Sequence, residues 1–208
     1  MTADFLEKIT YPRTKFRSHR QANTAIEKFL ADTREHIGKG LHLGAGDSKL
    51  RGLINCDLFN PKADLKIDAT NLSMIDDGSV DWIESHHLIE HLSFQETDRA
   101  LTEWNRVLRN RGLLVLTCPD ILRICMDWIK YSTLYPFFPR PEKLDYMAKM
   151  LVGSQEHEGM FHKNAFDSRR ISRILSKHGF VVEFSYSPYP LRTTPSLLVI
   201  ARKAYSLS

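Results

Sequence analysis

Short apolar runs alternate with longer polar or amphipathic segments through the middle of this chain, and this alternation constrains its fold more than any other feature. The runs are GLHLG at 40–44, GLINCD at 52–57, DLKIDA at 64–69, SVDWIES at 79–85 and GLLVLTC at 112–118. Each run has the length of a strand, and strands separated by crossovers form parallel sheets that are covered on both faces. The sequence therefore predicts an α/β fold with a doubly wound, mostly parallel sheet.

Regular patterns also flank this region. Apolar residues recur at roughly helical spacing in the segment 23–37, where Asn23 or Thr24 is available to cap a leading helix. A second amphipathic helix is expected around Leu101 and Trp104, just before the last of the apolar runs. The tail follows with a helix and two strands that can pair as an antiparallel edge, at 167–179, 180–187 and 196–203.

The stretch 119–166 interrupts this rhythm with several prolines, many aromatics and no strand pattern, so we expect an insertion that forms a lid after the fifth strand. A chain of 208 residues with 42% apolar content is long enough for one well-buried domain and short for two. We therefore expect a single domain made of an N-terminal helical segment, a central core, the lid, and a C-terminal helix with strands. Their bounds are 1–38, 39–118, 119–166 and 167–208.

Composition and charge exclude several classes of function. A net charge of +4 is far from the basic excess of a dedicated nucleic-acid binder, so no nucleic-acid partner is expected. The three cysteines form no CxxC pair, and their odd number leaves no closed set of disulfides. The N-terminus lacks the pattern of a signal peptide, and no window approaches about 18 consecutive apolar residues. We expect a cytoplasmic protein without a membrane partner.

The turn LHLGAGDSK after the first apolar run is the first candidate for ligand binding. Gly44 and Gly46 allow the backbone to bend sharply and to approach a ligand at the carboxyl edge of the sheet. A dinucleotide fingerprint would continue to a third glycine, where this chain has Lys49, and Asp47 would place a negative charge where a pyrophosphate must sit. The turn therefore disfavours NAD and FAD, and it suits a positively charged ligand without a phosphate.

Acidic residues end the next two apolar runs. Asp57 can accept hydrogen bonds from both hydroxyls of a ribose, and Asp68 is placed within reach of an adenine amino group. A single acid at the end of a strand is often a helix cap or part of a solvated turn. Two acids at consecutive strand ends after a glycine turn are a much more specific pattern.

Together these motifs resemble those of class I S-adenosylmethionine-dependent methyltransferases, and of the small type 11 group associated with bacterial natural-product and polysaccharide pathways. The resemblance covers about Lys39 to Asp120 through LHLGAG, INCD, IDAT, SVDWIESHHLIEHL and EWNRVLRNRGLLVLTCPD, and more loosely the tail through GSQEHEGMFHKNAFD and ILSKHGF. It implies a Rossmann-like fold, methyl transfer, and S-adenosylmethionine as the cofactor. Because only 13 positions separate Gly44 from Asp57, the first crossover helix is expected to be short or missing.

The resemblance also implies a set of cofactor contacts. The glycine turn would pass under the methionine moiety, Asp57 would hold the ribose, and Asp68 with its neighbour would flank the adenine. Two residues at the end of the fourth run would line the cofactor on its other side. The cofactor-binding residues implied in this way are Gly44, Ala45, Gly46, Asp57, Asp68, Ala69, Ser85 and His86.

The stretch SHHLIEHL at 85–92 holds the candidate catalytic residues. His87 and His91 stand at i and i+4, so on a helix they would share one face at the carboxyl edge of the sheet. A hydroxyl or protonated amine must lose a proton when it is methylated, and histidine is suited to take it. We predict that His87 or His91 is the catalytic base, oriented by Glu90 or by the other histidine. Alternatively, His91 packs within the start of a helix whose first turn Glu90 stabilises.

Further candidates lie in the expected lid and near the N-terminus. Gln155, His157 and His162 are predicted to contact the substrate, with a solvated loop as the alternative. Converging histidines could hold a metal, but the His-Glu-x-x-His spacing is absent, so we predict no metal site. Arg17 belongs to a mild basic cluster that can attract an acidic substrate or form a solvated face.

The sequence thus predicts an S-adenosylmethionine-dependent methyltransferase for a small-molecule, sugar or peptide-derived acceptor, acting by O-methylation with histidine-assisted deprotonation. One alternative is a carboxylate or N-methyltransferase that positions its substrate with arginines such as Arg17 and Arg192. Another is a partner protein that binds the cofactor without catalysis. A third, a nicotinamide-dependent reductase, would have to bind its cofactor without the third glycine.

Overall fold

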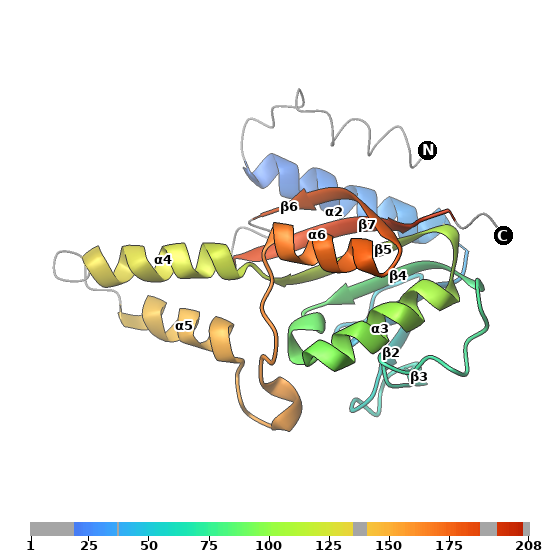
Figure 1. Cartoon of the computed structure of the whole chain (residues 1–208), viewed down its shortest axis with the longest axis horizontal. Helices are drawn as coiled ribbons and strands as arrows, with labels where there is room; N and C mark the ends of the chain where they lie inside the picture. Colours follow the sequence, from blue (N-terminus) through green and yellow to red (C-terminus); the bar gives the residue numbers. More distant parts are fainter. Residues whose placement is uncertain (1–18, 37, 135–140, 188–194, 206–208) are drawn as a thin grey trace.

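A seven-stranded sheet forms the centre of the computed structural model, which describes residues 19–36, 38–134, 141–187 and 195–205 (Figure 1). The strands are β1 (Gly40–Leu43), β2 (Ile54–Asp57), β3 (Leu65–Lys66), β4 (Val80–His86), β5 (Leu108–Pro119), β6 (Phe180–Tyr186) and β7 (Ser196–Lys203). Their order is β3-β2-β1-β4-β5-β7-β6, and β7 runs antiparallel to both of its neighbours while the other pairs are parallel. The sheet confirms the predicted fold class, including the antiparallel pair at one edge.

The strand order changes direction between β1 and β4. The chain first adds β2 and β3 on one side of β1, and then crosses to add β4 and β5 on the other side. The carboxyl ends of the two central strands lie side by side, since Leu43 of β1 pairs with Ser85 of β4. In an open parallel sheet, such a switch point leaves a crevice outside the carboxyl ends, and ligands bind there.

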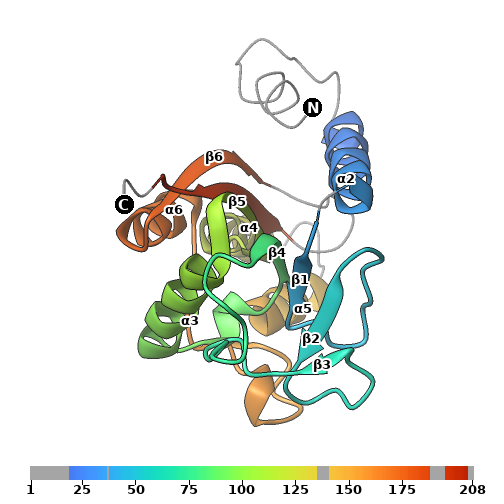
Figure 2. The same cartoon turned by 90° about the vertical axis from the view of Figure 1, so that its right-hand side faces the viewer.

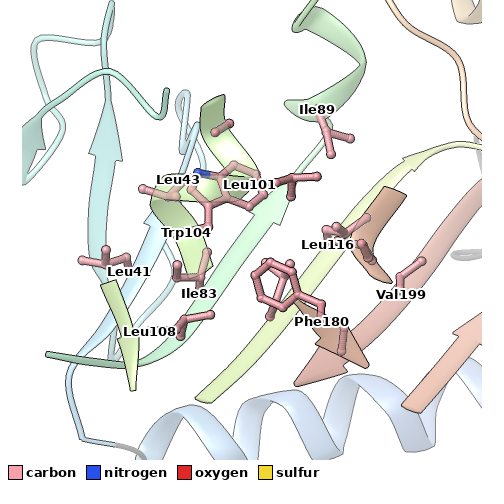
Figure 3. Close-up of a cluster of buried hydrophobic side chains, with 14 of the residues drawn as sticks. Leu41, Leu43, Ile83, Ile89, Leu101, Trp104, Leu108, Leu116, Phe180 and Val199 are labelled. Atoms are coloured by element: carbon pink, nitrogen blue, oxygen red, sulfur yellow. The ribbon is translucent and has the colours of Figure 1, made fainter. Parts of the chain in front are cut away.

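Alternate residues of the strands pack into two hydrophobic clusters, one on each face of the sheet. In β4, Trp82 belongs to the cluster beneath α2 (His19–His36), and Ile83 belongs to the larger cluster beneath α3 (Phe94–Val107) and α6 (Ser168–Lys177). Figure 2 shows α2 on one side of the sheet with α3 and α6 on the other, and Figure 3 shows the larger cluster around Trp104. Helices therefore cover both faces, as the sequence predicts.

Helix α2 begins at His19, so Asn23 and Thr24 lie inside it and the predicted N-cap is wrong. The apolar periodicity marks only the stretch that packs on the sheet, whereas the helix extends by a further polar turn before it. Ile26, Phe29 and Leu30 are buried against the sheet, and each such side chain contributes roughly 1.5 to 3 kcal/mol of burial free energy. Among the described residues, no helix combines the length and apolar content that a bilayer crossing requires.

The connection between β1 and β2 is short. Residues 44–53, all of which the structure describes, form turns and contain no helix. This confirms the expectation from the 13 positions between Gly44 and Asp57. The glycine turn is therefore held by hydrogen bonds to the neighbouring strand ends rather than by the start of a crossover helix.

The described residues of the segment 119–166 form two α-helices and a short 3-10 helix, Glu158–Met160, where the sequence showed only an interruption of the strand pattern. Helix α4 (Ile121–Leu134) follows β5 directly, and α5 (Pro141–Val152) packs against it beyond the carboxyl end of the sheet (Figure 1). After α5 the chain returns to the sheet edge, where the amides of Lys163 and Asn164 donate to the carbonyl of Glu90 at 2.8 and 3.0 Å. The role of this segment as a substrate lid stays a prediction.

Candidate active site

The glycine turn has the backbone conformation that its residues suggest. Gly44 and Gly46 have φ angles of 70° and 49°, in the left-handed region that favours glycine. A Cβ atom at Gly44 would lie 2.9 Å from the side chain of Leu88, so glycine is also needed there for close packing. A Cβ atom at Gly46 would meet nothing within 4 Å, so open space lies above this residue. Ala45 is buried, and its amide donates to the carbonyl of Cys56 at 3.0 Å.

Asp57 ends β2 and ties the glycine turn to the turn that follows β2. Its Oδ2 accepts a hydrogen bond from the amide of Gly46, and its Oδ1 accepts from the amides of Phe59 and Asn60, each at 2.8 Å. Burial acts to raise the pKa of Asp57, but these amide donors outweigh it and hold the pKa below its usual value. An ionised carboxylate offers about four acceptor positions, so one remains for a ligand hydroxyl.

Asp68 and Ala69 follow β3 and are partly buried. The side chain of Asp68 accepts a hydrogen bond from the amide of Thr70 at 2.8 Å, and the carbonyl of Ala69 accepts one from the indole of Trp104 at 2.8 Å. The first contact lies within the loop after β3, and the second anchors this loop to helix α3. The adenine contact of Asp68 and Ala69 stays a prediction.

Ser85 and His86, at the end of β4, point their side chains away from the open edge. Ser85 is 1% exposed and packs in the core, so its side chain does not line an open crevice. The ring of His86 turns back along the sheet, with Nε2 at 2.7 Å from Glu84 Oε1 and Nδ1 at 3.1 Å from Thr117 Oγ1. If these two residues contact the cofactor as predicted, they do so mainly through their main chain.

Glu84 is a buried charged residue that sequence reasoning missed. It is fully buried in β4, where Arg34 of α2 donates to both of its oxygens at 2.8 and 2.9 Å and Trp82 donates through its indole at 3.2 Å. Burial acts to raise the pKa of Glu84, but the hydrogen bonds from His86 and Arg34 outweigh it and lower the pKa to about 2. A glutamate inside an apolar strand pattern was the available signal, because such a residue is almost never buried without a partner.

His87 and His91 do not share a helix, so the predicted common face is wrong. His87 follows β4 with a φ angle of 52°, and the next helical residues form only a short 3-10 turn, Ile89–His91. The amide of His87 donates to the carbonyl of Thr117 at 2.9 Å, which continues the pairing with β5 and delays the start of a helix. A non-glycine residue in the left-handed region is often found at functional sites.

The ring of His87 lies between a carboxylate and a hydroxyl. Its Nδ1 is 3.0 Å from Oε1 of the buried Glu90, and its Nε2 is 3.1 Å from Oγ of Ser196 at the start of β7. A carboxylate, a histidine and a serine hydroxyl are linked in the same order in the catalytic triad of serine hydrolases. Ser196 is fully buried, however, so its hydroxyl is not accessible to a substrate, whereas the side chain of His87 is 40% exposed. The contact instead fixes the orientation of an accessible imidazole.

His91 and His162 meet at the same edge, although they are far apart in the sequence. Their rings lie edge to face, with centroids 4.8 Å apart. The Nδ1 of His91 is 3.2 Å from the carbonyl of Phe161, and the Nδ1 of His162 is 2.9 Å from the carbonyl of Met150. Burial lowers the pKa of His91, which favours its neutral form. His162 thus lies beside the SHHLIEHL stretch, and its contact with the substrate stays a prediction.

The other predicted substrate residues lie apart from this pair. His157 is exposed and its ring is near that of Phe59, just after Asp57, with centroids 6.3 Å apart. Gln155 is exposed in a left-handed conformation, with a φ angle of 60°. Arg17 lies outside the residues that the structure describes. His157 thus lies near the end of β2, and His162 lies near the residues that follow β4.

A separate hollow of about 440 Å³ lies between α3 and α6. None of the predicted site residues lines it. Its walls include Phe94, Asp98, Arg170, Arg173 and Lys177, which are partly paired with one another across the two helices. The glycine turn and the histidines therefore form the candidate site, and this hollow does not belong to it.

Comparison with known proteins relates part of the chain to a described family of domains. Residues 47–116, from the glycine turn to the middle of β5, match a family described as Methyltransferase domain (Methyltransf_11). No curated protein matches the chain by sequence.

Solved structures share the fold over most of the chain. A SAM-dependent methyltransferase from Methanosarcina mazei is 17% identical, with a TM-score of 0.56 over 81% of this chain and 93% of that chain. The magnesium protoporphyrin IX methyltransferase from Synechocystis PCC 6803, solved with bound SAH, is 13% identical, with a TM-score of 0.56 and coverages of 98% and 95%. The 1,6-didemethyltoxoflavin-N1-methyltransferase from Burkholderia thailandensis is 14% identical, with a TM-score of 0.54 and coverages of 98% and 87%.

At these identities the solved structures establish the fold, and the domain match adds the enzyme class. A methyltransferase domain on this fold confirms the predicted activity, methyl transfer, and the predicted cofactor, S-adenosylmethionine.

Proposed function

We propose that this methyltransferase acts on a hydroxyl oxygen of a small-molecule, sugar or peptide-derived acceptor, and that His87 removes the acceptor's proton. The contact between His87 and Glu90 carries the proposal. Since a carboxylate only accepts hydrogen bonds, Nδ1 of His87 bears the proton that points to Glu90, 3.0 Å away. The lone pair is therefore on Nε2, where it accepts the hydrogen bond of the Ser196 hydroxyl at 3.1 Å, and the acceptor hydroxyl must replace this contact for Nε2 to act as the base.

His87 fits this role better than His91. Glu90 orients the imidazole of His87 and stabilises the positive charge that the ring would gain with the proton. Among the residues that the structure describes, His91 has only the carbonyl of Phe161 as its hydrogen-bond acceptor, and its ring packs against that of His162. An oriented and accessible ring at the end of β4 is what proton removal from an acceptor in the crevice requires.

The residues around the glycine turn fit S-adenosylmethionine. The space above Gly46 is open, Asp47 beside it is exposed and negative, and Asp57 retains an acceptor position for a ribose hydroxyl. When bound, S-adenosylmethionine supplies the methyl group, which forms a C–O bond to the acceptor as its C–S bond breaks and leaves S-adenosylhomocysteine. His87 keeps the released proton until it passes to solvent.

The acceptor class rests on the comparisons. The Synechocystis and Burkholderia enzymes are named for small molecules, a magnesium porphyrin and 1,6-didemethyltoxoflavin. Their common fold supports a small-molecule acceptor for this chain, within the natural-product or polysaccharide pathways that the motifs suggest. The carboxylate alternative depends on Arg17 and Arg192, which lie outside the described residues.

The test begins with identification of the acceptor. The protein is incubated with methyl-labelled S-adenosylmethionine and an extract of its source organism, and the labelled product is identified by mass spectrometry. With that acceptor, His87→Gln is expected to lower kcat by about 10² to 10⁴, while the affinity for S-adenosylhomocysteine stays unchanged. The control is His36→Gln on the exposed end of α2, which should retain normal kinetics.

Two results would contradict the proposal in different ways. An unchanged kcat in His87→Gln, with a large rise in KM in Arg17→Gln, indicates a carboxylate acceptor that needs positioning and no base. Tight binding of S-adenosylhomocysteine without any labelled product indicates a partner protein that binds the cofactor without catalysis.

A further inference from the structure

We propose that Glu90, His91 and His162 form a binding site for a divalent transition-metal ion, with Zn²⁺ as the expected occupant. One donor atom from each of the three residues lies within 4.8 Å of the other two. Small rotations of the three side chains bring such atoms to the distances of about 2.0 to 2.2 Å that Zn²⁺ takes from imidazole and carboxylate ligands. Two imidazoles and one carboxylate are a ligand set that zinc enzymes use.

The hydrogen bonds of both histidines prepare them for a metal. A carbonyl oxygen only accepts hydrogen bonds, so the contacts to Phe161 and Met150 place the proton of each ring on Nδ1. The lone pair of Nε2 is then available in His91 and in His162. Histidines that bind metals usually donate their other ring N–H to a carbonyl or carboxylate in this way.

Glu90 supplies the strongest argument for a cation. The residue is 1% exposed, and its Oε2 is buried without a hydrogen-bond partner among the described residues. The ion pairs of the described part of the chain give it no lysine or arginine, and His87 contacts only Oε1. A buried carboxylate oxygen without a partner is costly, and a metal ion would satisfy it. His87 would then orient the carboxylate from the other side.

The main chain brings the third ligand to the other two. The amide of His162 donates to the carbonyl of Val152 at 3.1 Å, and the two residues that follow His162 donate to the carbonyl of Glu90. Gly153 makes the close approach possible, because a Cβ atom there would lie 1.9 Å from the carbonyl oxygen of Met160. The sequence predicted no metal because the ligands have no recognisable spacing. The fold supplies the missing ligand from a segment 71 positions after His91.

The site also has a chemical use, which rests on the proposed function. Three protein ligands leave a coordination position open on a tetrahedral ion, as in catalytic zinc sites. An acceptor hydroxyl bound at that position loses its proton more readily, because the ion stabilises the oxygen anion. His87 presents its Nδ1–H to the ligand Glu90, so the released proton goes to solvent or to Nε2 on the other side of that ring.

Metal binding can be tested without any methyl transfer. Tag-free protein is treated with a chelator, and Zn²⁺ binding is measured by equilibrium dialysis with metal analysis, followed by titration with Co²⁺ to record its visible absorption. We expect one Zn²⁺ per chain, and Mg²⁺ at the same concentration should not compete. Replacement of a ligand, in Glu90→Gln or His162→Gln, is expected to weaken Zn²⁺ binding by at least about 100-fold. The matched control is His157→Gln, since His157 is an exposed histidine of the same segment outside the cluster.

Circular dichroism of each metal-free variant shows whether it is folded, so a loss of binding is not confused with unfolding. No stoichiometric Zn²⁺ binding by the wild-type protein would overturn the proposal, as would equal binding by His162→Gln and His157→Gln. A second arm compares the methylation rates of chelated and Zn²⁺-reloaded enzyme. Equal rates there, with Zn²⁺ bound as expected, would refute acceptor activation by the metal and leave both the metal site and the role of His87 intact.

Discussion

Arg34 of helix α2 binds the fully buried carboxylate of Glu84 through two hydrogen bonds, from Nε to Oε2 at 2.8 Å and from Nη2 to Oε1 at 2.9 Å. The pair joins the helix to the centre of β4, whose end leads into the candidate site. Because Glu84 also contacts His86, the same carboxylate holds the last residue of β4 in place. Stability and the position of the site edge are therefore linked through one side chain.

Removing the arginine should destabilise the fold strongly. Arg34→Met is expected to lower the free energy of unfolding by about 3 to 5 kcal/mol, because it leaves Glu84 buried without its cationic partner. Urea denaturation measures this. Arg109→Met is the control, because Arg109 pairs with Asp81 at the surface and is more than half exposed. Its effect should stay within about 1 kcal/mol, and similar losses in both variants would contradict the assignment.

Glu84 should also make the stability depend on acidity. The pKa of Glu84 is about 2 in the folded protein, below its ordinary value of 4.5, so its ionisation stabilises the fold fully above about pH 4.5. This contribution, at most about 3 kcal/mol, is lost as the pH falls through about 2. Between pH 5 and pH 3, Glu84→Gln should therefore lose less stability than the wild-type protein. Parallel stability curves for the two proteins would show that Glu84 does not titrate in this way.

Asp57→Asn tests the predicted ribose contact. We expect the free energy of binding S-adenosylhomocysteine to weaken by about 1 to 3 kcal/mol, measured by calorimetry, because a charge-assisted hydrogen bond is lost. Asp57 also accepts a hydrogen bond from Gly46, so the substitution can loosen the glycine turn itself. An S-adenosylhomocysteine analogue without ribose hydroxyls separates the two effects, since it should bind both proteins equally if the diol is what Asp57 holds.

A control for charge alone is Asp76→Asn, at an exposed acid near the opposite end of β4. Its affinity for S-adenosylhomocysteine should match that of the wild-type protein. A loss of affinity for the analogue in Asp57→Asn, equal to the loss for the parent compound, would mean that Asp57 acts only through the turn.

Gly153→Ala should loosen the segment that carries His162. Gly153 has a φ angle of 84°, and a Cβ atom there would lie 1.9 Å from the carbonyl oxygen of Met160. Gly78→Ala is a matched control, because Gly78 has a φ angle of 62° but a Cβ atom there would have 3.9 Å to its nearest neighbour. Both variants carry the strain of a positive φ angle, and only Gly153→Ala adds the clash.

Hydrogen exchange measures the difference between these two variants. The amides of residues 160–164 should exchange faster in Gly153→Ala than in Gly78→Ala, and the thermal stability of Gly153→Ala should be the lower one. Equal exchange of these amides in the two variants would show that the segment does not depend on the close approach at Gly153.

The sequence alone determined the elements whose physics is local. Strand-length apolar runs, the glycines of the first turn and acids at two strand ends specify a parallel sheet with a ligand edge, because periodicity and backbone conformation depend on neighbouring residues. The shortness of the first crossover could likewise be predicted, by counting the residues between Gly44 and Asp57. The N-cap of α2 could not, since the polar turn that extends this helix beyond its buried stretch carries no apolar period.

Only the tertiary structure decided how the polar residues of the edge are arranged. The helical face expected for His87 and His91 does not form, because the amide of His87 pairs with Thr117 of β5. Glu84 is held by an arginine 50 positions earlier in the chain. The ring of His91 packs against that of His162, which follows α5. Contacts between residues so far apart are set by how strands and helices pack, and no spacing along the chain encodes them.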